Sequence, residues 1–152
     1  MTTPTTRRST GRSPLQTAAL LYGVVFLLVG VAGFVPGITT GYDSMRFAGH
    51  SSEAMLMGVF QVSILHNLVH LLYGIAGLAL ARTSSGARAY LRWGGAVYLL
   101  LWLYGLLIDK DSTANFVPLN TADDWLHLLL GVTMVALSFL GGTRDRTASP
   151  GR

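Results

Sequence analysis

Cysteine is absent from this sequence of 152 residues, which excludes disulfides, iron–sulfur clusters and cysteine-ligated zinc. Charged residues are scarce: Asp, Glu, Lys and Arg make up 12% of the chain, about half the share found in a soluble domain. The sequence also has no phosphate-binding loop, no dinucleotide-binding glycine pattern and no nucleophile elbow. These absences remove the common enzyme classes, and we expect a protein without catalytic activity.

Apolar residues, in contrast, make up 51% of the chain, and the mean hydropathy is +0.48. They gather in four long runs, each of which can cross a bilayer as a helix of about 20 residues. We predict an all-α integral membrane four-helix bundle over residues 15–141, between disordered cytoplasmic tails at 1–14 and 142–152. The predicted spans cover residues 15–35, 56–81, 90–108 and 121–140. A signal peptide is the alternative for the first run, but no small-residue cleavage site follows it.

The basic residues indicate how the spans are oriented. They flank the apolar runs and form no patch with interleaved aromatics, so the net charge of +4 does not indicate nucleic-acid binding. Two connections carry only Arg46 and Lys110. The two ends and the middle turn carry the other nine basic residues: Arg7, Arg8, Arg12, Arg82, Arg88, Arg92, Arg144, Arg146 and Arg152. Because cytoplasmic segments are enriched in Lys and Arg, both termini are predicted to lie in the cytoplasm of a bacterium, with the chain in its plasma membrane.

The two halves of the chain resemble each other. Gly23-x-x-Phe26 in the first run aligns with Gly95-x-x-Tyr98 in the third, and both continue to a glycine seven residues further on. His-Leu-Leu-x-Gly occurs in the second run from His70 and in the fourth from His127. We therefore predict two repeated helical hairpins related by a pseudo-twofold axis along the membrane normal.

Ionisable residues inside spans are costly and usually face the bundle interior. His66 and His70 are four residues apart on the second span, and Asp123 and His127 are four apart on the fourth. Residues at this spacing share one helix face. His66, His70, Asp123 and His127 could thus together bind a transition metal, since imidazole and carboxylate suit zinc, iron, manganese or copper. Alternatively, His70 and His127 could be the axial ligands of one haem b.

Two further interpretations of this cluster stay open. Histidines and carboxylates can hydrogen-bond one another and join helices as a structural network, which Asn67 and Asp124 could extend. The same residues could also form a proton or ion path. The long connection 36–53 is rich in glycine and aromatics and is predicted to cover the outer mouth of the bundle. Whether its His50 reaches the cluster is left open.

Three motifs resemble a known family. They are Phe47–His50, the stretch from Gly58 to Gly74, and Asn115–Leu128 with its Asp-Asp-Trp-Leu-His core. In these motifs, and over 15–140 generally, the chain resembles the small bacterial four-span membrane proteins catalogued as domain of unknown function 4383. The resemblance implies four transmembrane helices and a plasma-membrane setting, with no established activity. The chain departs from this family at Asp124, because we expect asparagine or histidine at this position in the family.

Two functions follow as expectations. The first is a small accessory or scaffold subunit of a larger membrane complex, because the chain is short and its helix faces are rich in glycine. The second is a metal- or haem-binding membrane protein that uses the His/Asp cluster, with redox activity as one form of this function. The expected partners are the lipid bilayer and either other membrane proteins or further copies of the chain, with no nucleic acid.

Overall fold

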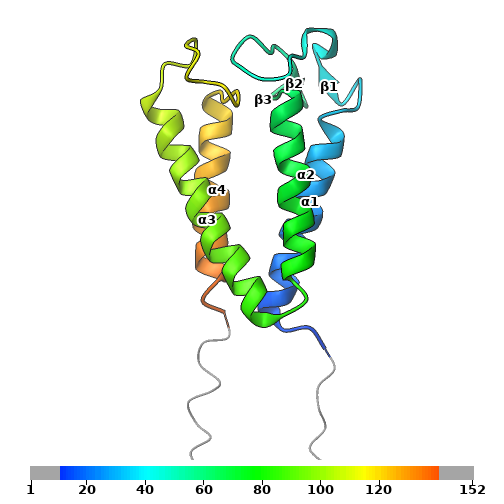
Figure 1. Ribbon diagram of the computed structural model, residues 1–152, viewed down its shortest axis with the longest axis vertical. Coiled ribbons are helices and arrows are strands. Elements are labelled where there is room, and N and C mark those ends of the chain that lie inside the picture. Colours follow the sequence, from blue (N-terminus) through cyan, green and yellow to red (C-terminus); the bar gives the residue numbers. More distant parts are fainter. Residues whose placement is uncertain (1–10, 141–152) are drawn as a thin grey trace, which may run out of the picture.

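The computed structural model describes residues 11–140, so the predicted tail 142–152 and the first ten residues of the predicted tail 1–14 lie outside the described residues. Most of the described chain is helical, in four α-helices. Figure 1 shows α1 beside α2 and α3 beside α4, with the connections α1–α2 and α3–α4 at one end and the α2–α3 turn at the other. The helices are α1 (Pro14–Ala32), α2 (Ile64–Leu80), α3 (Ser84–Leu107) and α4 (Thr121–Leu137).

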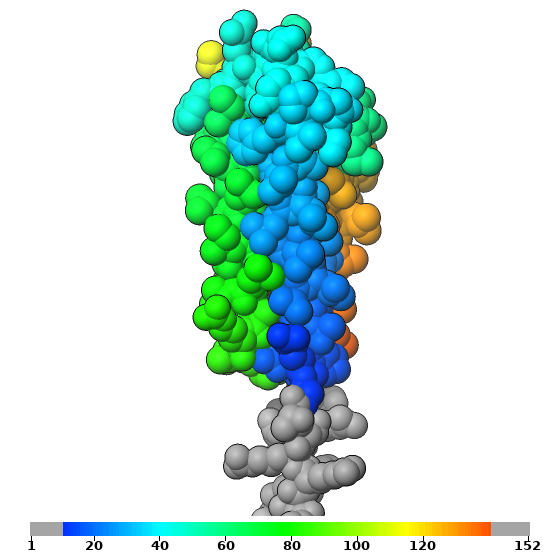
Figure 2. Space-filling model, turned by 90° about the vertical axis from the view of Figure 1, so that its right-hand side faces the viewer, coloured from blue at the N-terminus to red at the C-terminus, as the bar shows by residue number. Residues whose placement is uncertain are grey.

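A small antiparallel sheet occupies the connection between α1 and α2. Its strands are β1 (Thr39–Thr40), β2 (Met55–Leu56) and β3 (Phe60–Gln61), in the order β1-β2-β3, and the 3₁₀ helix η1 (Tyr42–Ser44) follows β1. Together, residues 33–63 and 108–120 form what we call the cap, which covers the end of the bundle in Figure 2.

The sheet corrects the predicted start of the second span. The prediction placed residue 56 inside a helix, but α2 begins only at Ile64, and residues 55–61 form a β-hairpin. Met57 and Gly58 both adopt positive φ, 55° and 70°, at the tip of this hairpin. Glycine adopts such angles readily and methionine does not. The apolar run concealed this turn because hydropathy does not distinguish an apolar β-hairpin from a helix.

Side-chain caps fix the helix starts. Ser13 caps α1 in a capping box with Gln16, and Asn120 caps α4 in a capping box with Asp123. Ser63 caps α2 by accepting a hydrogen bond from the His66 N–H at 3.1 Å. Thr83 caps α3 in the same way, so that α3 begins six residues before the predicted start at residue 90. Each cap satisfies a backbone N–H that the helix itself leaves unpaired.

Glycines hold together the two pairs of neighbouring helices, α1 with α2 and α3 with α4, which we call the helical hairpins. A methyl group added at Gly23 of α1 would lie 2.9 Å from the backbone nitrogen of Leu78 in α2. A methyl group at Gly95 of α3 would lie 2.9 Å from the backbone nitrogen of Val135 in α4. These are the two glycines that the sequence alignment of the halves pairs, and each allows two helix backbones to approach closely.

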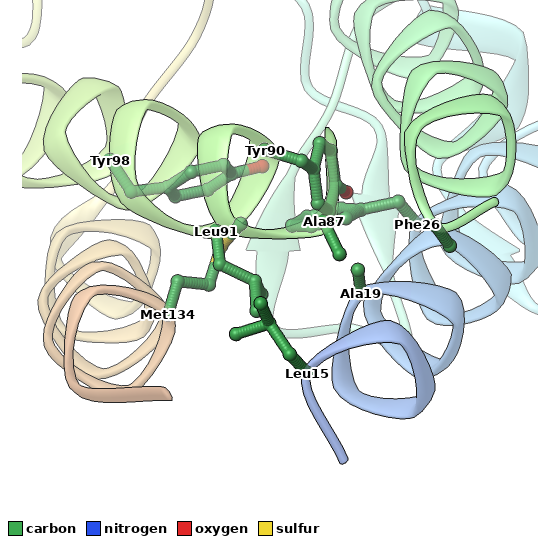
Figure 3. Packing of buried hydrophobic residues seen from close by; sticks show 9 residues of the cluster. Leu15, Ala19, Phe26, Ala87, Tyr90, Leu91, Tyr98 and Met134 are labelled. Atoms are coloured by element: carbon green, nitrogen blue, oxygen red, sulfur yellow. The ribbon is translucent and has the colours of Figure 1, made fainter. Parts of the chain in front are cut away.

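A hydrophobic core joins the two hairpins at the end near the α2–α3 turn. Leu15 and Ala19 of α1 meet Leu91 of α3 and Met134 of α4 in this core (Figure 3), and all four are nearly or fully buried. The hydroxyls of Tyr22 and Thr133 add a hydrogen bond of 2.6 Å between α1 and α4. Nearer the cap, a cavity lies between the two hairpins.

The outer surface of the helices is apolar, whereas several buried residues are polar. Leu28, Leu72, Leu107 and Leu129, one from each helix, are at least 60% exposed. The polar residues buried within the helices are His66, Asn67, Asp123, Asp124 and His127. By length and composition, α1 is the one described helix that could cross a membrane; α2 is also apolar but has 17 residues.

Candidate functional site

A cavity of about 160 Å³ lies between the two helical hairpins in the half of the bundle next to the cap. We call it the chamber. Its walls are almost entirely apolar. Its lining residues are Val25, Phe26 and Val29 of α1; Leu56, Met57, Phe60 and Val62 of the cap; His66 and His70 of α2; Tyr98 of α3; and Asp123, Leu126, His127 and Leu130 of α4.

All four residues of the predicted metal set line this chamber. The His66 and His70 rings lie on one face of α2, with centroids 4.6 Å apart. The His127 ring stands edge-on to Tyr98, with centroids 5.1 Å apart at 72°. His66, Asp123 and His127 are each less than 5% exposed. The structure therefore brings these four polar residues together around one cavity.

Three histidines that line the chamber each have a ring nitrogen without a partner in the described part of the chain. The Nδ1 atoms of His66, His70 and His127 are buried and have no hydrogen-bond partner among residues 11–140. Leaving a buried polar atom unsatisfied costs about 1–3 kcal/mol. Buried groups of this kind usually bind a ligand, an ion or ordered water. Three of them around one small cavity make it the strongest candidate site in the described part of the chain.

Asp123 has a structural task as well as its place in the chamber. One of its oxygens, Oδ2, accepts hydrogen bonds from the backbone N–H groups of Asn120 at 2.9 Å and Gln61 at 3.1 Å. The Asn120 side chain also donates to the carbonyl oxygen of Val59 at 2.8 Å. These bonds fasten the β2–β3 hairpin, which follows α1, to the start of α4 in the other half of the chain.

The predicted cofactors fit the chamber less well than the predicted residues do. Within residues 11–140, no group of three or more His, Asp or Glu side chains is arranged to hold a metal ion. The chamber volume is also below the range of about 300–1,000 Å³ that drug-sized ligands occupy. A haem between His70 and His127 would require the hairpins to separate.

The roof of the chamber differs from the predicted one. Residues 36–53 were expected to cover it, but the β2–β3 hairpin supplies Leu56, Met57 and Phe60 to its lining. The 36–53 connection packs outside this hairpin, where the Ser52 hydroxyl donates to the Val62 carbonyl at 2.7 Å. His50 is not among the lining residues; its carbonyl oxygen accepts a hydrogen bond from the Gln61 side chain at 3.0 Å.

The sequence interpretation missed the aromatic floor of the chamber. The Phe26 ring lies between His70 and Tyr98, 5.9 Å from the first and 5.3 Å from the second, inclined by 29° to each. The alignment of the halves already pairs Phe26 with Tyr98. That pairing was a signal for a shared place near the bundle axis, and it could have marked both residues.

Asp124 lies apart from the chamber, as the buried partner of an ion pair. Its Oδ2 is 2.7 Å from the Lys110 ammonium, which also donates to the carbonyl oxygen of Gly105 at 2.7 Å. Asn67, its counterpart in the alignment of the halves, is fully buried, and neither amide atom has a hydrogen-bond partner within the described residues. Gly33 and Gly105 leave the space that these two side chains occupy.

A family model described as Domain of unknown function (DUF4383) matches residues 16–140. The chain belongs to this family. The match covers most of the chain, including all four helices, the cap and every residue that lines the chamber. Membership in DUF4383 confirms the suspected resemblance, and the family description assigns no activity. No curated protein and no solved structure matches the chain.

Proposed function

We propose that this DUF4383 protein crosses the membrane four times and binds a small lipophilic molecule in the chamber. The observation that carries the proposal is the combination of apolar walls with three buried, unpartnered imidazole nitrogens. Binding sites are typically apolar cavities with a few convergent polar groups that orient the ligand. Val25 and Met57 line the chamber and are also 48% and 70% exposed, so the cavity reaches the molecular surface beside α1.

Two observations support the membrane setting. Large apolar side chains face outwards from all four helices while histidine, asparagine and aspartate are buried, which suits surroundings of lipid rather than water. Nine of the eleven basic residues belong to the two ends, the α2–α3 turn and the first half of α3, while the cap contains Arg46 and Lys110. Both termini would then be cytoplasmic and the cap external.

Matching contacts support the proposal that the helical hairpins are structural repeats. Gly23 packs on α2 as Gly95 packs on α4, and Gly33 faces Asn67 as Gly105 faces Asp124. The chamber lies between the two units, where repeats related by an axis along the membrane normal would place aligned residues around a common centre.

The accessory-subunit hypothesis loses one of its motivations. It rested on the short chain, the lack of catalytic motifs and glycine-rich helix faces that could receive a partner, but Gly23, Gly74, Gly95 and Gly131 pack inside the helical hairpins. Those faces are therefore occupied within the chain itself. An accessory role stays a prediction, with stoichiometric recovery of partners in mild detergent as its test.

Metal binding remains a second candidate because of the i,i+4 pair His66 and His70. Their rings are 4.6 Å apart and both Nδ1 atoms are unpartnered within the described residues. Elemental analysis and an absorption spectrum of the gently purified protein test this candidate. A transition metal bound at one equivalent would favour it, and its absence from protein that retains its fold would exclude it.

The membrane topology can be tested with single cysteines, because the chain has none of its own. Thr113→Cys would place a thiol in the cap, and Ser85→Cys would place one at the α2–α3 turn. A membrane-impermeant maleimide should label Thr113→Cys in intact cells and Ser85→Cys only after the membrane is opened. Equal labelling of both variants in intact cells would contradict the four-span topology.

Ligand binding can be tested by blocking the chamber from α1. Val25→Trp should fill the opening, whereas Val24→Trp changes a neighbouring exposed residue that does not line the chamber. Solvent extracts of the wild-type protein and the Val24 variant should contain the same lipophilic small molecule in mass spectra. The Val25 variant should lack it. Identical extracts from all three proteins would contradict the proposal.

A further inference from the structure

The size, floor and polar groups of the chamber narrow the chemistry of its ligand. We infer that the chamber binds a lipid whose head is a single ring bearing hydrogen-bonding oxygen atoms, as in alkylphenols and alkylated quinones. This inference rests on the proposed function and adds the chemical class of the ligand. It is a statement about binding and assigns no reaction to the site.

The volume limits the head to about one ring. The chamber measures about 160 Å³, close to the volume of about 150 Å³ at which an apolar cavity in a protein binds benzene. A fused ring system or a macrocycle would not fit. A single six-membered ring fills the chamber and leaves its substituents close to the walls.

The floor favours a planar head. His70, Phe26 and Tyr98 follow one another at ring-centroid distances of 5.9 and 5.3 Å, and His127 stands edge-on to Tyr98. Aromatic rings attract one another in offset-stacked and edge-to-face arrangements. A planar ring in the chamber would therefore stack on the aromatic side chains of the floor. An aliphatic chain could not make these ring–ring contacts.

The polar groups that line the chamber favour a ligand head whose oxygen atoms carry no full charge. A neutral imidazole offers one donor and one acceptor, so His66, His70 and His127 can bond to a carbonyl or a hydroxyl. No lysine or arginine lies among the lining residues. Lys110, the cation of the connection that precedes α4, is already paired with Asp124. A phosphate head would thus lack the cation it needs, and a plain hydrocarbon would leave the three Nδ1 atoms without a partner.

The path of the tail is set by the apolar side of the chamber. Val25 and Val29 of α1 line it together with Leu126 and Leu130 of α4. Val25 is about half exposed, so the lining continues to the outer surface between hydrophobic helices. An alkyl tail attached to the ring can follow these residues into the bilayer while the ring stays between the histidines.

The inference can be tested with two tritiated probes of equal tail length, decyl-1,4-benzoquinone and decylbenzene, on the full chain in phospholipid nanodiscs. The quinone should bind saturably at one site per chain, and decylbenzene about tenfold more weakly, the range expected for one or two hydrogen bonds to buried groups. His70→Phe and His127→Phe keep an aromatic ring and remove its nitrogens. Each should weaken quinone binding by about tenfold and leave decylbenzene binding unchanged.

The outcomes distinguish the inference about the ligand class from the proposal that the chamber binds a lipophilic molecule. Equal binding of both probes, both lost in Val25→Trp, would overturn the ring-oxygen inference and leave the lipophilic chamber standing. No saturable binding of either probe would overturn both. If the histidine variants fail to fold, competition on the wild-type protein decides: unlabelled decylphenol should displace the quinone at about tenfold lower concentration than decylbenzene does, and equal potency would overturn the inference.

Discussion

The Lys110 ammonium lies 2.7 Å from a carboxylate oxygen of Asp124, which is 4% exposed. The aligned residue of the other helical hairpin, Asn67, is uncharged. A buried carboxylate requires a compensating charge, while an amide does not. The acid therefore occurs together with a lysine in one half, and an amide takes its place in the other.

Lys110→Met should destabilise the fold by about 3 kcal/mol, because it leaves the Asp124 carboxylate buried without its partner. The double variant Lys110→Met/Asp124→Asn should recover most of this loss, since the second half then has an uncharged amide at position 124, as the first half has at Asn67. Reversible unfolding in detergent micelles measures both. If the single variant matches the wild-type protein, the ion pair does not contribute to stability.

The converse substitution tests the same relationship in the first half. Asn67→Asp introduces an acid at a fully buried position with no cation beside it within the described residues. It should lower the free energy of unfolding by about 3 kcal/mol or more. Asn67→Leu is the matched control, because it removes the amide without adding charge and should cost less. A smaller loss for Asp than for Leu would show that position 67 has an unrecognised cationic or hydrogen-bonding partner.

Close packing of the helical hairpins predicts the effect of Gly95→Ala. The added methyl group would lie 2.8 Å from a methyl carbon of Val135 and 2.9 Å from the Gly131 carbonyl oxygen. Helices α3 and α4 would have to separate, which should cost about 1–3 kcal/mol. Leu100→Ala, on the exposed side of the same helix, should change the free energy of unfolding by less than about 0.5 kcal/mol. Equal effects of the two variants would contradict this account.

The sequence predicted the helices and the polar cluster better than it predicted the cap. Helical spacing placed His66 beside His70 and Asp123 on the face of His127, because residues four apart share a face wherever a helix forms. The β2–β3 hairpin was missed, since its residues are as apolar as those of the helix that follows. The partner of Asp124 was missed for another reason: Lys110 is fourteen residues away across a loop, and no local pattern indicates that contact.

The hydrogen bond between Asp123 and Gln61 fastens the roof of the chamber to α4. The Asp123 carboxylate accepts the Gln61 N–H at 3.1 Å and the Asn120 N–H at 2.9 Å. Asp123→Ala removes both bonds, so the β2–β3 hairpin should separate from α4 more often. Hydrogen–deuterium exchange of residues 55–62 should then be about tenfold faster, corresponding to one or two lost hydrogen bonds.

The control for this change is Asp109→Ala, which removes a bond from the Asp111 N–H to the Asp109 side chain at 3.0 Å in the other half of the cap. Its effect on exchange should be confined to the loop after α3. Because the β2–β3 hairpin lines the chamber, the Asp123 variant should also release decyl-1,4-benzoquinone faster than the wild-type protein does. Unchanged exchange at residues 55–62 in Asp123→Ala would mean that other cap contacts hold the roof, and Asp123 would then serve α4 alone.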